Sequence, residues 1–240
     1  MKTRLFFRHL LLAGLLFATL NAAPEAGRYL RTQDFDATKV IPVAPAADSL
    51  ATLADLETVY QVQLRRTPEQ VTLANYFAAD TVFQYDAVIG PWFTAANLPR
   101  TAEIFLQIAA DRSAISSAGK AVWNRPRPPL LDPRIHACAP LPKSGSYPSG
   151  HSTQAFLWAG LLAEVFPERR AALRERAELV AWSRVVAGVH YPTDIAAGRV
   201  LGDRLVREFL QVPALHAALE EIRAEVAPFV ARKAPVLAPP

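Results

Sequence analysis

Eleven residues in three blocks of the chain have the types and the spacing needed to bind and transfer a phosphoryl group. In chain order the blocks are Lys120-x6-Arg127-Pro128, Pro148-Ser149-Gly150-His151 and Ser183-Arg184-x5-His190-x3-Asp194. A phosphate ester is an anion, and in its transition state the negative charge spreads over three equatorial oxygens. Its catalysis therefore depends mainly on positioning and on electrostatic stabilisation, which cationic and hydrogen-bonding side chains supply.

Two arginines and a lysine in these blocks provide the positive charge. Arg127 and Arg184 carry planar guanidinium groups that can each grip two oxygens, whereas Lys120 acts as a compact point charge. Ser149 adds a hydroxyl donor. Together these four side chains are expected to hold a phosphate.

A glycine followed by an apolar run indicates a helix that begins at the site. Gly150 allows the backbone to approach a ligand closely, and the helix is expected to start near Ser152 or Thr153. The N-terminus of a helix presents free N–H groups and a positive dipole end. We expect this end to face the anion.

Two histidines can carry the steps that cations cannot. Phosphoryl transfer through a covalent intermediate needs a nucleophile opposite the leaving group and an acid beside it, and imidazole can do either near neutral pH. Asp194 follows His190 by four positions. A carboxylate that holds one ring nitrogen as N–H leaves the lone pair of the other nitrogen free to attack phosphorus. We therefore interpret His190 as the nucleophile and His151 as the acid.

The spacing of the third block predicts a corner between two helices. On one continuous helix, six residues turn through about 600°, so Arg184 and His190 would point roughly 120° apart. Gly188 and Pro192 predict a helix end, a turn and a new helix between them. His190 and Asp194 are then expected at a tight interhelical corner.

The three blocks together resemble the signature of the type 2 phosphatidic acid phosphatase superfamily, which also contains the vanadium-dependent haloperoxidases. All eleven positions match. The stretch from Gly145 to His151 and the chain length further resemble the bacterial class A non-specific acid phosphatases, which are secreted to the periplasm. The resemblance extends from about residue 42 to about residue 210.

This resemblance implies a role for each matching residue. His190 would become phosphorylated with Asp194 as its partner, and His151 would protonate the leaving oxygen and then activate water. The phosphate would be held by Lys120, Arg127, Ser149, Gly150 and Arg184. The substrate would be a small-molecule phosphomonoester with broad specificity, and no metal or other cofactor is expected. The role of Arg125, two positions before Arg127, is left open between a charge behind the site and a solvated turn residue.

The elements that must position these residues are predicted to be helices. Apolar residues recur at spacings of three and four over 47–64, 68–87, 101–123, 153–166, 167–188, 192–210 and 213–231, with Pro or Gly at most breaks. The proline-rich stretch from Asn124 to Pro148 is expected to form one wall of the site. The predicted fold is an all-α, single-domain helical bundle of the type 2 phosphatidic acid phosphatase and haloperoxidase type.

The beginning of the chain has the pattern of an export signal. Three basic residues precede an apolar run from Leu10 to Leu20, with cleavage expected after Ala22 or Ala23. We therefore predict a signal peptide (1–22), an N-terminal extension (23–41), an acid phosphatase domain (42–231) and a flexible tail (232–240). The protein is expected to be periplasmic or secreted, with no integral membrane segment after signal removal.

Composition excludes several other classes. The net charge of +4 falls to +1 without the signal, because residues 1–22 hold three basic and no acidic residues, and the remaining basic residues are scattered. No nucleic acid partner is therefore expected. The single cysteine, Cys138, rules out an intramolecular disulfide, and no metal-ligand pattern is visible. Assembly into a homo-oligomer is left open.

Three functional classes fit the site residues. The leading one is hydrolysis of phosphomonoesters with broad specificity, and action on lipid or prenyl phosphates presented from outside is an alternative to it. The second is vanadate-dependent halide oxidation, because vanadate mimics pentacoordinate phosphorus in the same cradle. The third is a non-catalytic phosphate-binding protein, for which the His190 and Asp194 pair would serve no purpose.

Overall fold

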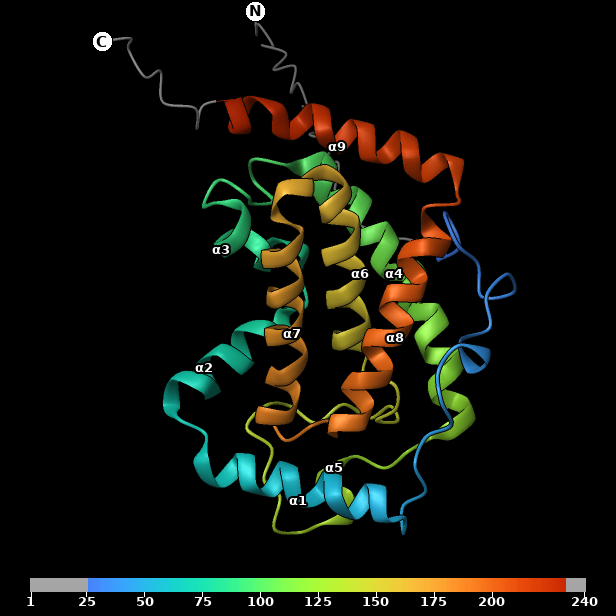
Figure 1. Ribbon diagram of the computed structural model, residues 1–240, viewed down its shortest axis with the longest axis vertical. Coiled ribbons are helices and arrows are strands. Elements are labelled where there is room, and N and C mark those ends of the chain that lie inside the picture. The colour runs from blue at the N-terminus through green and yellow to red at the C-terminus, as the bar shows by residue number, and fades with distance from the viewer. Residues whose placement is uncertain (1–25, 232–240) are drawn as a thin grey trace, which may run out of the picture.

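Three helices lie side by side at the centre of the computed structural model, which describes residues 26–231 (Figure 1). They are α6 (Gly150–Val165), α7 (Arg170–Val186) and α8 (Pro192–Phe209), and α6 packs against both of the others. Helix α6 is apolar on almost every side, as expected for a helix surrounded by others. It therefore forms the axis of the core.

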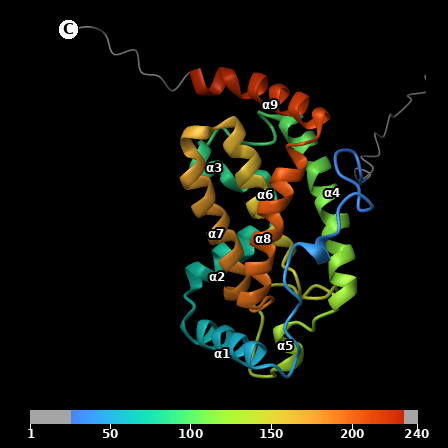
Figure 2. The same ribbon diagram turned by 45° about the vertical axis from the view of Figure 1, so that its right-hand side comes forward.

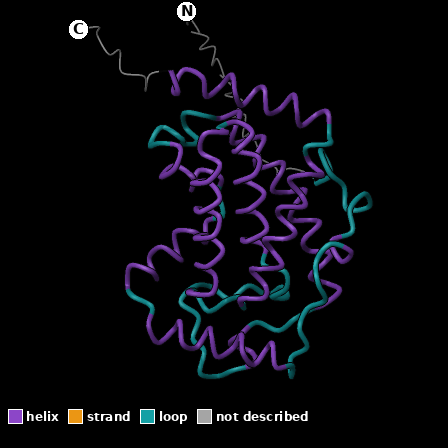
Figure 3. The backbone as a smooth tube through the Cα atoms, in the orientation of Figure 1, coloured by secondary structure: helices purple, strands orange, loops and turns teal. Residues whose placement is uncertain are grey.

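The remaining elements surround this central layer. Helix α4 (Pro99–Trp123) runs alongside α6, while α9 (Pro213–Ala231) and α1 (Leu50–Arg65) cross opposite ends of the bundle (Figures 1 and 2). The shorter helices are α2 (Pro68–Tyr76), α3 (Asp86–Ile89) and α5 (Pro128–Leu131), and four 3-10 turns cover Ala37–Lys39, Phe77–Ala79, Val82–Tyr85 and Pro167–Arg169. Helices and loops account for all of residues 26–231, without a strand (Figure 3). The predicted all-α fold is confirmed.

Helices α6 and α8 approach each other closely through two glycines. A Cβ atom added to Gly198 would lie 2.7 Å from the carbonyl oxygen of Ser149, and one added to Gly202 would lie 2.6 Å from that of Thr153. The backbone N–H of Ser149 also donates to the carbonyl of Asp194 at 3.1 Å. The N-terminal ends of α6 and α8 are therefore fixed against each other.

Two predicted helix boundaries differ from the structure. The single helix predicted over 68–87 is wrong, because Asp80 adopts the left-handed conformation (φ 50°) and separates α2 and its 3-10 extension from the turn that leads into α3. Aspartate tolerates this conformation better than most residues, so no glycine or proline announces the break. Helix α6 begins at Gly150, earlier than predicted, because the Oγ of Ser149 caps it by accepting from the N–H of Ser152 at 3.3 Å.

The segment before α1 packs onto the bundle. The carboxylate of Asp111 in α4 accepts hydrogen bonds from four consecutive backbone N–H groups, those of residues 27–30, at 2.6–3.2 Å. Tyr29, Phe35 and Ile41 are buried in the main core. From residue 26 onward, the predicted extension of 23–41 thus shares the core of the predicted domain.

Some predictions fall on other parts of the chain. The predicted signal peptide (1–22) and tail (232–240) lie outside the described residues. Among the helices of residues 26–231, none combines the length and the apolar character required to cross a membrane.

Candidate active site

Four helix ends and one long loop meet at the end of the bundle that is lowest in Figures 1 and 2. The C-terminal ends of α4 and α7 and the N-terminal ends of α6 and α8 lie there, together with the loop 124–149. They enclose a cavity of about 260 Å³. Five residues of the predicted site line it, namely Lys120, Arg127, Gly150, His151 and His190.

His190 and Asp194 form a hydrogen-bonded pair at the corner between α7 and α8. The Nδ1 atom of His190 lies 3.0 Å from Oδ2 of Asp194, and the backbone N–H of Tyr191 donates to the same oxygen at 3.0 Å. The corner forms because Gly188 ends α7 with a positive φ of 74° and Pro192 begins α8. The imidazole is thus oriented by a carboxylate that belongs to the next helix.

The other ring nitrogen of His190 faces the cationic side of the cavity. Nη1 of Arg127 lies 3.1 Å from Nε2 of His190 and also donates to the carbonyl of Val189 at 2.7 Å. These partners assign the proton to Nδ1 and the lone pair to Nε2. Burial, and to a lesser extent the charges of Arg127 and Lys120, lower the pKa of His190 to about 3, against the opposing effect of Asp194. The ring is therefore neutral and its Nε2 lone pair is available.

Arg127, which is buried, and Lys120, which is half-buried, border this nitrogen, and neither forms an ion pair with a carboxylate within residues 26–231. The Nζ atom of Lys120 donates to the carbonyl of Gly145 at 2.7 Å, and Nε of Arg127 donates to that of Ser144 at 3.0 Å. Burial and their mutual repulsion lower the pKa of Lys120 to about 7, and burial lowers that of Arg127 to about 10. A bound anion would relieve both effects, so this side of the cavity is suited to phosphate.

The other predicted phosphate-binding residues lie just behind the cavity wall. Arg184 is 2% exposed, and its Nη1 donates to the carbonyl of Ala74 at 3.0 Å, while its Nε has no partner within residues 26–231. Ser149 is fully buried and caps α6. The structure thus brings most of the predicted residues to one cavity, but Arg184 and Ser149 are not among its lining residues. Their roles stay predictions.

His151 lines the same cavity but has different charged neighbours from His190. Its pKa is lowered by burial first and then by the charges of Arg184 and Arg112, whereas Asp80 acts in the opposite direction. Its Nε2 atom is buried and has no hydrogen-bond partner in the described part of the chain. This nitrogen is available to a ligand in the cavity.

Arg125, whose role the sequence left open, lies behind the site in a buried ionic network. Its Nη1 contacts Oδ1 of Asp194 at 2.7 Å and its Nη2 contacts Oδ2 of Asp55 at 3.1 Å. The guanidinium also stacks on the ring of Tyr191, 3.8 Å from the centroid. Burial alone would raise the pKa of Asp194, but the hydrogen bond from His190 and the charge of Arg125 hold it below the usual value. The pairing carboxylate therefore stays ionised.

Sequence reasoning missed four residues of this region. Asp55 and Ser146 belong to the network around Asp194, to which the hydroxyl of Ser146 donates, and Arg112 and Asp80 line the cavity. The sequence contains two signals that could have pointed to Asp55 and Arg112. Asp55 shares the buried face of α1 with Leu56 and Val59, and Arg112 follows Asp111 inside a helix with a largely apolar core face. Both are polar residues at positions where periodicity predicts burial.

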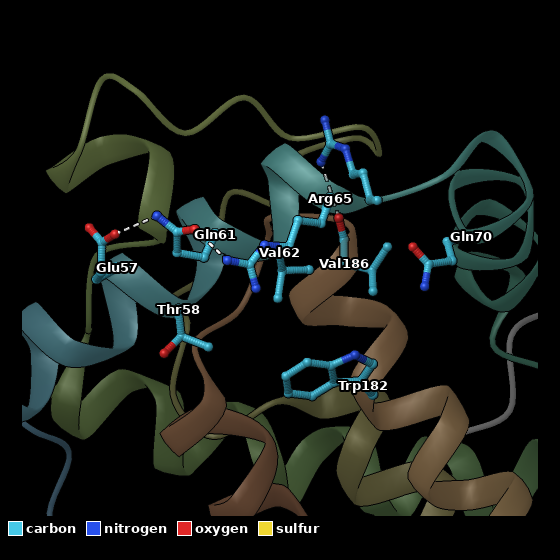
Figure 4. A pocket seen from close by; sticks show the side chains of 9 residues that line it. Glu57, Thr58, Gln61, Val62, Arg65, Gln70, Trp182 and Val186 are labelled. Atoms are coloured by element: carbon cyan, nitrogen blue, oxygen red, sulfur yellow. Dashed lines mark hydrogen bonds between the residues drawn. The ribbon is translucent and has the colours of Figure 1, made fainter.

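A larger hollow of about 380 Å³ lies elsewhere, between α1, α2 and α7 (Figure 4). Its polar groups bind one another, since Gln61 donates to Glu57 at 2.8 Å and accepts from Arg65 at 3.3 Å. None of the eleven motif residues lines it. Nor do the described residues include a group of three or more His, Cys, Asp or Glu side chains arranged to hold a metal ion. The smaller cavity is the candidate active site.

A neutral histidine paired with a carboxylate and facing buried cations, at one end of a helical bundle, defines a phosphoryl-transfer protein. Comparison with known proteins then gives the family. Residues 102–215 match the model of the PAP2 superfamily. This is the superfamily that the three sequence blocks resemble, so that prediction is confirmed.

Several curated relatives are acid phosphatases. The chain is 29% identical over 204 residues to an acid phosphatase of Zymomonas mobilis subsp. mobilis, covering 80% of this chain and 76% of that protein. It is 30% identical over 148 residues to a non-specific acid phosphatase of Salmonella typhimurium, covering 59% of each. A non-specific acid phosphatase of Providencia stuartii is 24% identical over 218 residues, with 87% and 88% covered.

Two solved structures share the fold. A transmembrane PAP2-type phosphatidylglycerolphosphate phosphatase from Bacillus subtilis has a TM-score of 0.51 and 21% identity, covering 71% of this chain and 89% of that one. A bacterial vanadium-dependent iodoperoxidase has a TM-score of 0.50 and 20% identity, covering 72% and 52%. At these identities the likeness establishes the helical architecture alone.

Proposed function

We propose that the protein is an acid phosphatase that hydrolyses small phosphomonoesters through a phosphohistidine formed on His190. The observation that carries the proposal is the unprotonated Nε2 of His190, which lines the cavity side 3.1 Å from Arg127 while Nδ1 is held by Asp194. The named relatives are acid phosphatases, which supports the same activity.

In the first step, Nε2 of His190 attacks phosphorus as the bond from phosphorus to the ester oxygen breaks. Asp194 keeps its hydrogen bond to the Nδ1–H and stabilises the positive charge that develops on the ring. His151 gives its proton to the departing oxygen, so an alcohol leaves and a phosphohistidine remains. Lys120 and Arg127 stabilise the charge on the three equatorial oxygens.

In the second step, His151 is neutral and accepts a proton from water as the water oxygen attacks phosphorus. The bond between phosphorus and Nε2 breaks, phosphate leaves, and His190 returns to its neutral form. His151 is protonated again and ready for the next ester. The two steps use the same two histidines in reversed roles.

Metal independence and broad specificity belong to the same proposal. Lys120, Arg127 and the N-terminus of α6 supply the positive charge that a metal ion supplies in other phosphatases. Two of the relatives carry the name non-specific acid phosphatase, which supports a wide range of leaving groups. A lipid or prenyl phosphate remains an alternative substrate for the same chemistry.

The deciding experiment measures release of p-nitrophenol from its phosphate ester at about pH 5 with excess chelator, in the wild type and in His190→Ala. We expect turnover that survives chelation and is abolished in the variant. Denaturing the wild type during turnover should trap a phosphoryl group that is labile in acid and stable in alkali. Loss of turnover with chelator, or a trapped phosphoryl group in His190→Ala, would refute the mechanism.

Vanadate separates phosphatase from haloperoxidase activity. Because vanadate resembles pentacoordinate phosphorus, it should inhibit release of p-nitrophenol by a phosphatase. Vanadate with peroxide and bromide or iodide should instead produce oxidised halide if the protein is a haloperoxidase. Inhibition without halide oxidation is the expected result.

We also propose that the enzyme is exported to the periplasm or secreted. The support is the basic start and apolar run within residues 1–22. Mass spectrometry of the protein from a periplasmic fraction should give a mature chain that begins at Ala23 or Pro24. A chain that retains residues 1–22 would contradict the proposal.

A further inference from the structure

We infer that Arg112 forms a subsite for a second anionic group, carried by the leaving group of the substrate. The inference rests on the proposed phosphatase function and adds the substrate class: phosphomonoesters whose alcohol part ends in a carboxylate or in another phosphate.

Arg112 lies on the wall of the same cavity as the phosphate-binding cations. It is eight residues before Lys120 on α4, with Ser116 midway between them, so the three side chains follow one face of the helix. All three line the cavity. Nη1 of Arg112 would lie 3.3 Å from a Cβ atom added to Gly150, which puts the guanidinium beside the first residue of α6.

The hydrogen-bonding capacity of Arg112 is largely unused. The residue is 8% exposed, and its one ion pair within residues 26–231 joins Nη2 to Oδ2 of Asp80 at 3.4 Å. Its Nε has no partner there, and neither has the Oγ of Ser116. Buried donors are normally satisfied, and a guanidinium that points unused donors into a cavity is suited to an oxyanion.

Arg112 lines the same cavity as His151, the proposed donor to the leaving oxygen, and its guanidinium lies beside Gly150, the residue that precedes His151. Its charge acts on His151 and also on Lys120. We therefore place Arg112 within reach of an anionic group on the alcohol part of the ester. Two further serines on α4, Ser113 and Ser117, line the cavity and add hydroxyl groups.

Asp80 opposes this subsite. Its carboxylate forms the long ion pair with Arg112 and would repel a second anion. Replacing it by asparagine keeps a residue that tolerates the left-handed conformation of this position (φ 50°). The Asp80→Asn exchange therefore removes the competing charge while the chain path is preserved.

The test compares three esters with the same three-carbon chain: propyl phosphate, its analogue ending in a carboxylate and its analogue ending in a second phosphate. We expect a higher kcat/KM for at least one anionic ester than for propyl phosphate in the wild type. In Arg112→Gln that preference should fall by about tenfold to hundredfold, the usual effect of losing a hydrogen bond to a charged group. Comparing the two anionic esters shows which group the subsite takes.

Two further variants sharpen the test. Asp80→Asn should increase the preference for the anionic esters, and a decrease would overturn the inference. Arg100→Gln removes an arginine from the same helix, but its guanidinium pairs with Glu103 and Glu221 away from the cavity. It should leave the preference between esters as in the wild type.

The outcomes distinguish this inference from the proposed function. Failure of the wild type to hydrolyse propyl phosphate would count against the function. Equal losses on all three esters in Arg112→Gln would overturn the subsite and would mean that Arg112 acts on the transferred phosphoryl group. Calorimetry with propylphosphonate and 3-phosphonopropionate tests the subsite without turnover. Only the second ligand should bind more weakly to Arg112→Gln, and equal weakening would refute the subsite.

Discussion

Asp194 is the residue on which the acid–base chemistry and the stability of the site both depend. One of its oxygens accepts from His190, Tyr191 and Ser146, and the other contacts Arg125. A buried carboxylate with this many donors remains ionised and cannot rotate. The orientation of His190, the proposed nucleophile, is therefore set by Asp194 and by the groups that hold Asp194.

Replacing Arg125 by methionine should destabilise the protein strongly. The change leaves two buried carboxylates, Asp55 and Asp194, without their shared cation, and breaking such a pair costs roughly 3–5 kcal/mol. Urea unfolding of wild type and variant measures the loss. A second exchange, Asp55→Asn, should recover part of it, because one unpaired charge disappears. A loss under about 1 kcal/mol would contradict the buried network.

The two histidines predict an acid optimum. His190 has a pKa of about 3 and is neutral above it, whereas the pKa of His151 lies below its usual value, so His151 is protonated only at acid pH. Activity needs both forms at once, so kcat/KM should fall on either side of a window between these values. Lys120, with a pKa of about 7, loses its charge at higher pH and extends the alkaline fall.

Comparison of the wild type with His151→Gln checks this assignment. The variant should lose most of its activity on alkyl phosphates and less on p-nitrophenyl phosphate, whose leaving group needs no proton. The pH profile of its remaining kcat/KM should lack the fall that we assign to loss of the His151 proton. It should keep the fall at higher pH that we assign to Lys120. The ionisation of the ester is common to both enzymes, so it does not affect the difference. Identical profiles would exclude His151 as the acid.

At the scale of elements, the position of α8 against α6 controls the site. The glycine contacts let the two backbones touch, and the bond from Ser149 to Asp194 joins the capped start of α6 to the first turn of α8. The anion-binding helix end and the carboxylate of the nucleophile pair therefore move together. A side chain at Gly198 or Gly202 would push the two backbones apart.

Gly202→Ala should reduce stability by about 1–3 kcal/mol, the usual cost of overpacking. The added Cβ would lie 2.6 Å from the carbonyl of Thr153, which is backbone and cannot turn away. We expect a lower melting temperature together with a lower kcat, measured on the same preparation. Val200→Ala on the exposed side of α8 is the matched control and should change neither. An unchanged melting temperature in Gly202→Ala would contradict the close approach.

Local spacing explains what the sequence could predict at this scale. The helices have clear apolar periodicity, and the turn at Gly188 and Pro192 is marked by the residues that require it. The helix break at Asp80 was not predicted, because no glycine or proline marks its left-handed conformation. The partners of Arg125 and Arg112 were not predicted because they lie 32 to 70 positions away along the chain, where no periodic pattern reports contact.

At the scale of the whole molecule, the site reduces stability in acid. The pKa of His190 is about 3 in the folded protein and about 6.5 in an unfolded chain. Between these values the unfolded state binds a proton that the folded state does not, so stability is lost as the pH falls from about 6.5 toward 3. The slope is about 1.4 kcal/mol per pH unit for one such group.

His190→Asn should remove this contribution. Urea unfolding at several pH values between about 4 and 6.5 should show a smaller decrease in free energy for the variant than for the wild type. His136→Asn replaces an exposed histidine and serves as the control. Its free energy of unfolding should change with pH as steeply as that of the wild type. A variant that loses stability in acid as steeply as the wild type would show that His190 is not buried in its neutral form.

The four hydrogen bonds from residues 27–30 to Asp111 also impose an order on folding. The donors and the carboxylate are separated by 81 to 84 positions, so the segment that leaves the ribosome first is fixed only after α4 has been synthesised. Until then its apolar residues, Tyr29 and Leu30, have no place to pack. The early chain therefore stays unpacked until α4 is available, and one carboxylate, that of Asp111, then fixes four successive peptide groups.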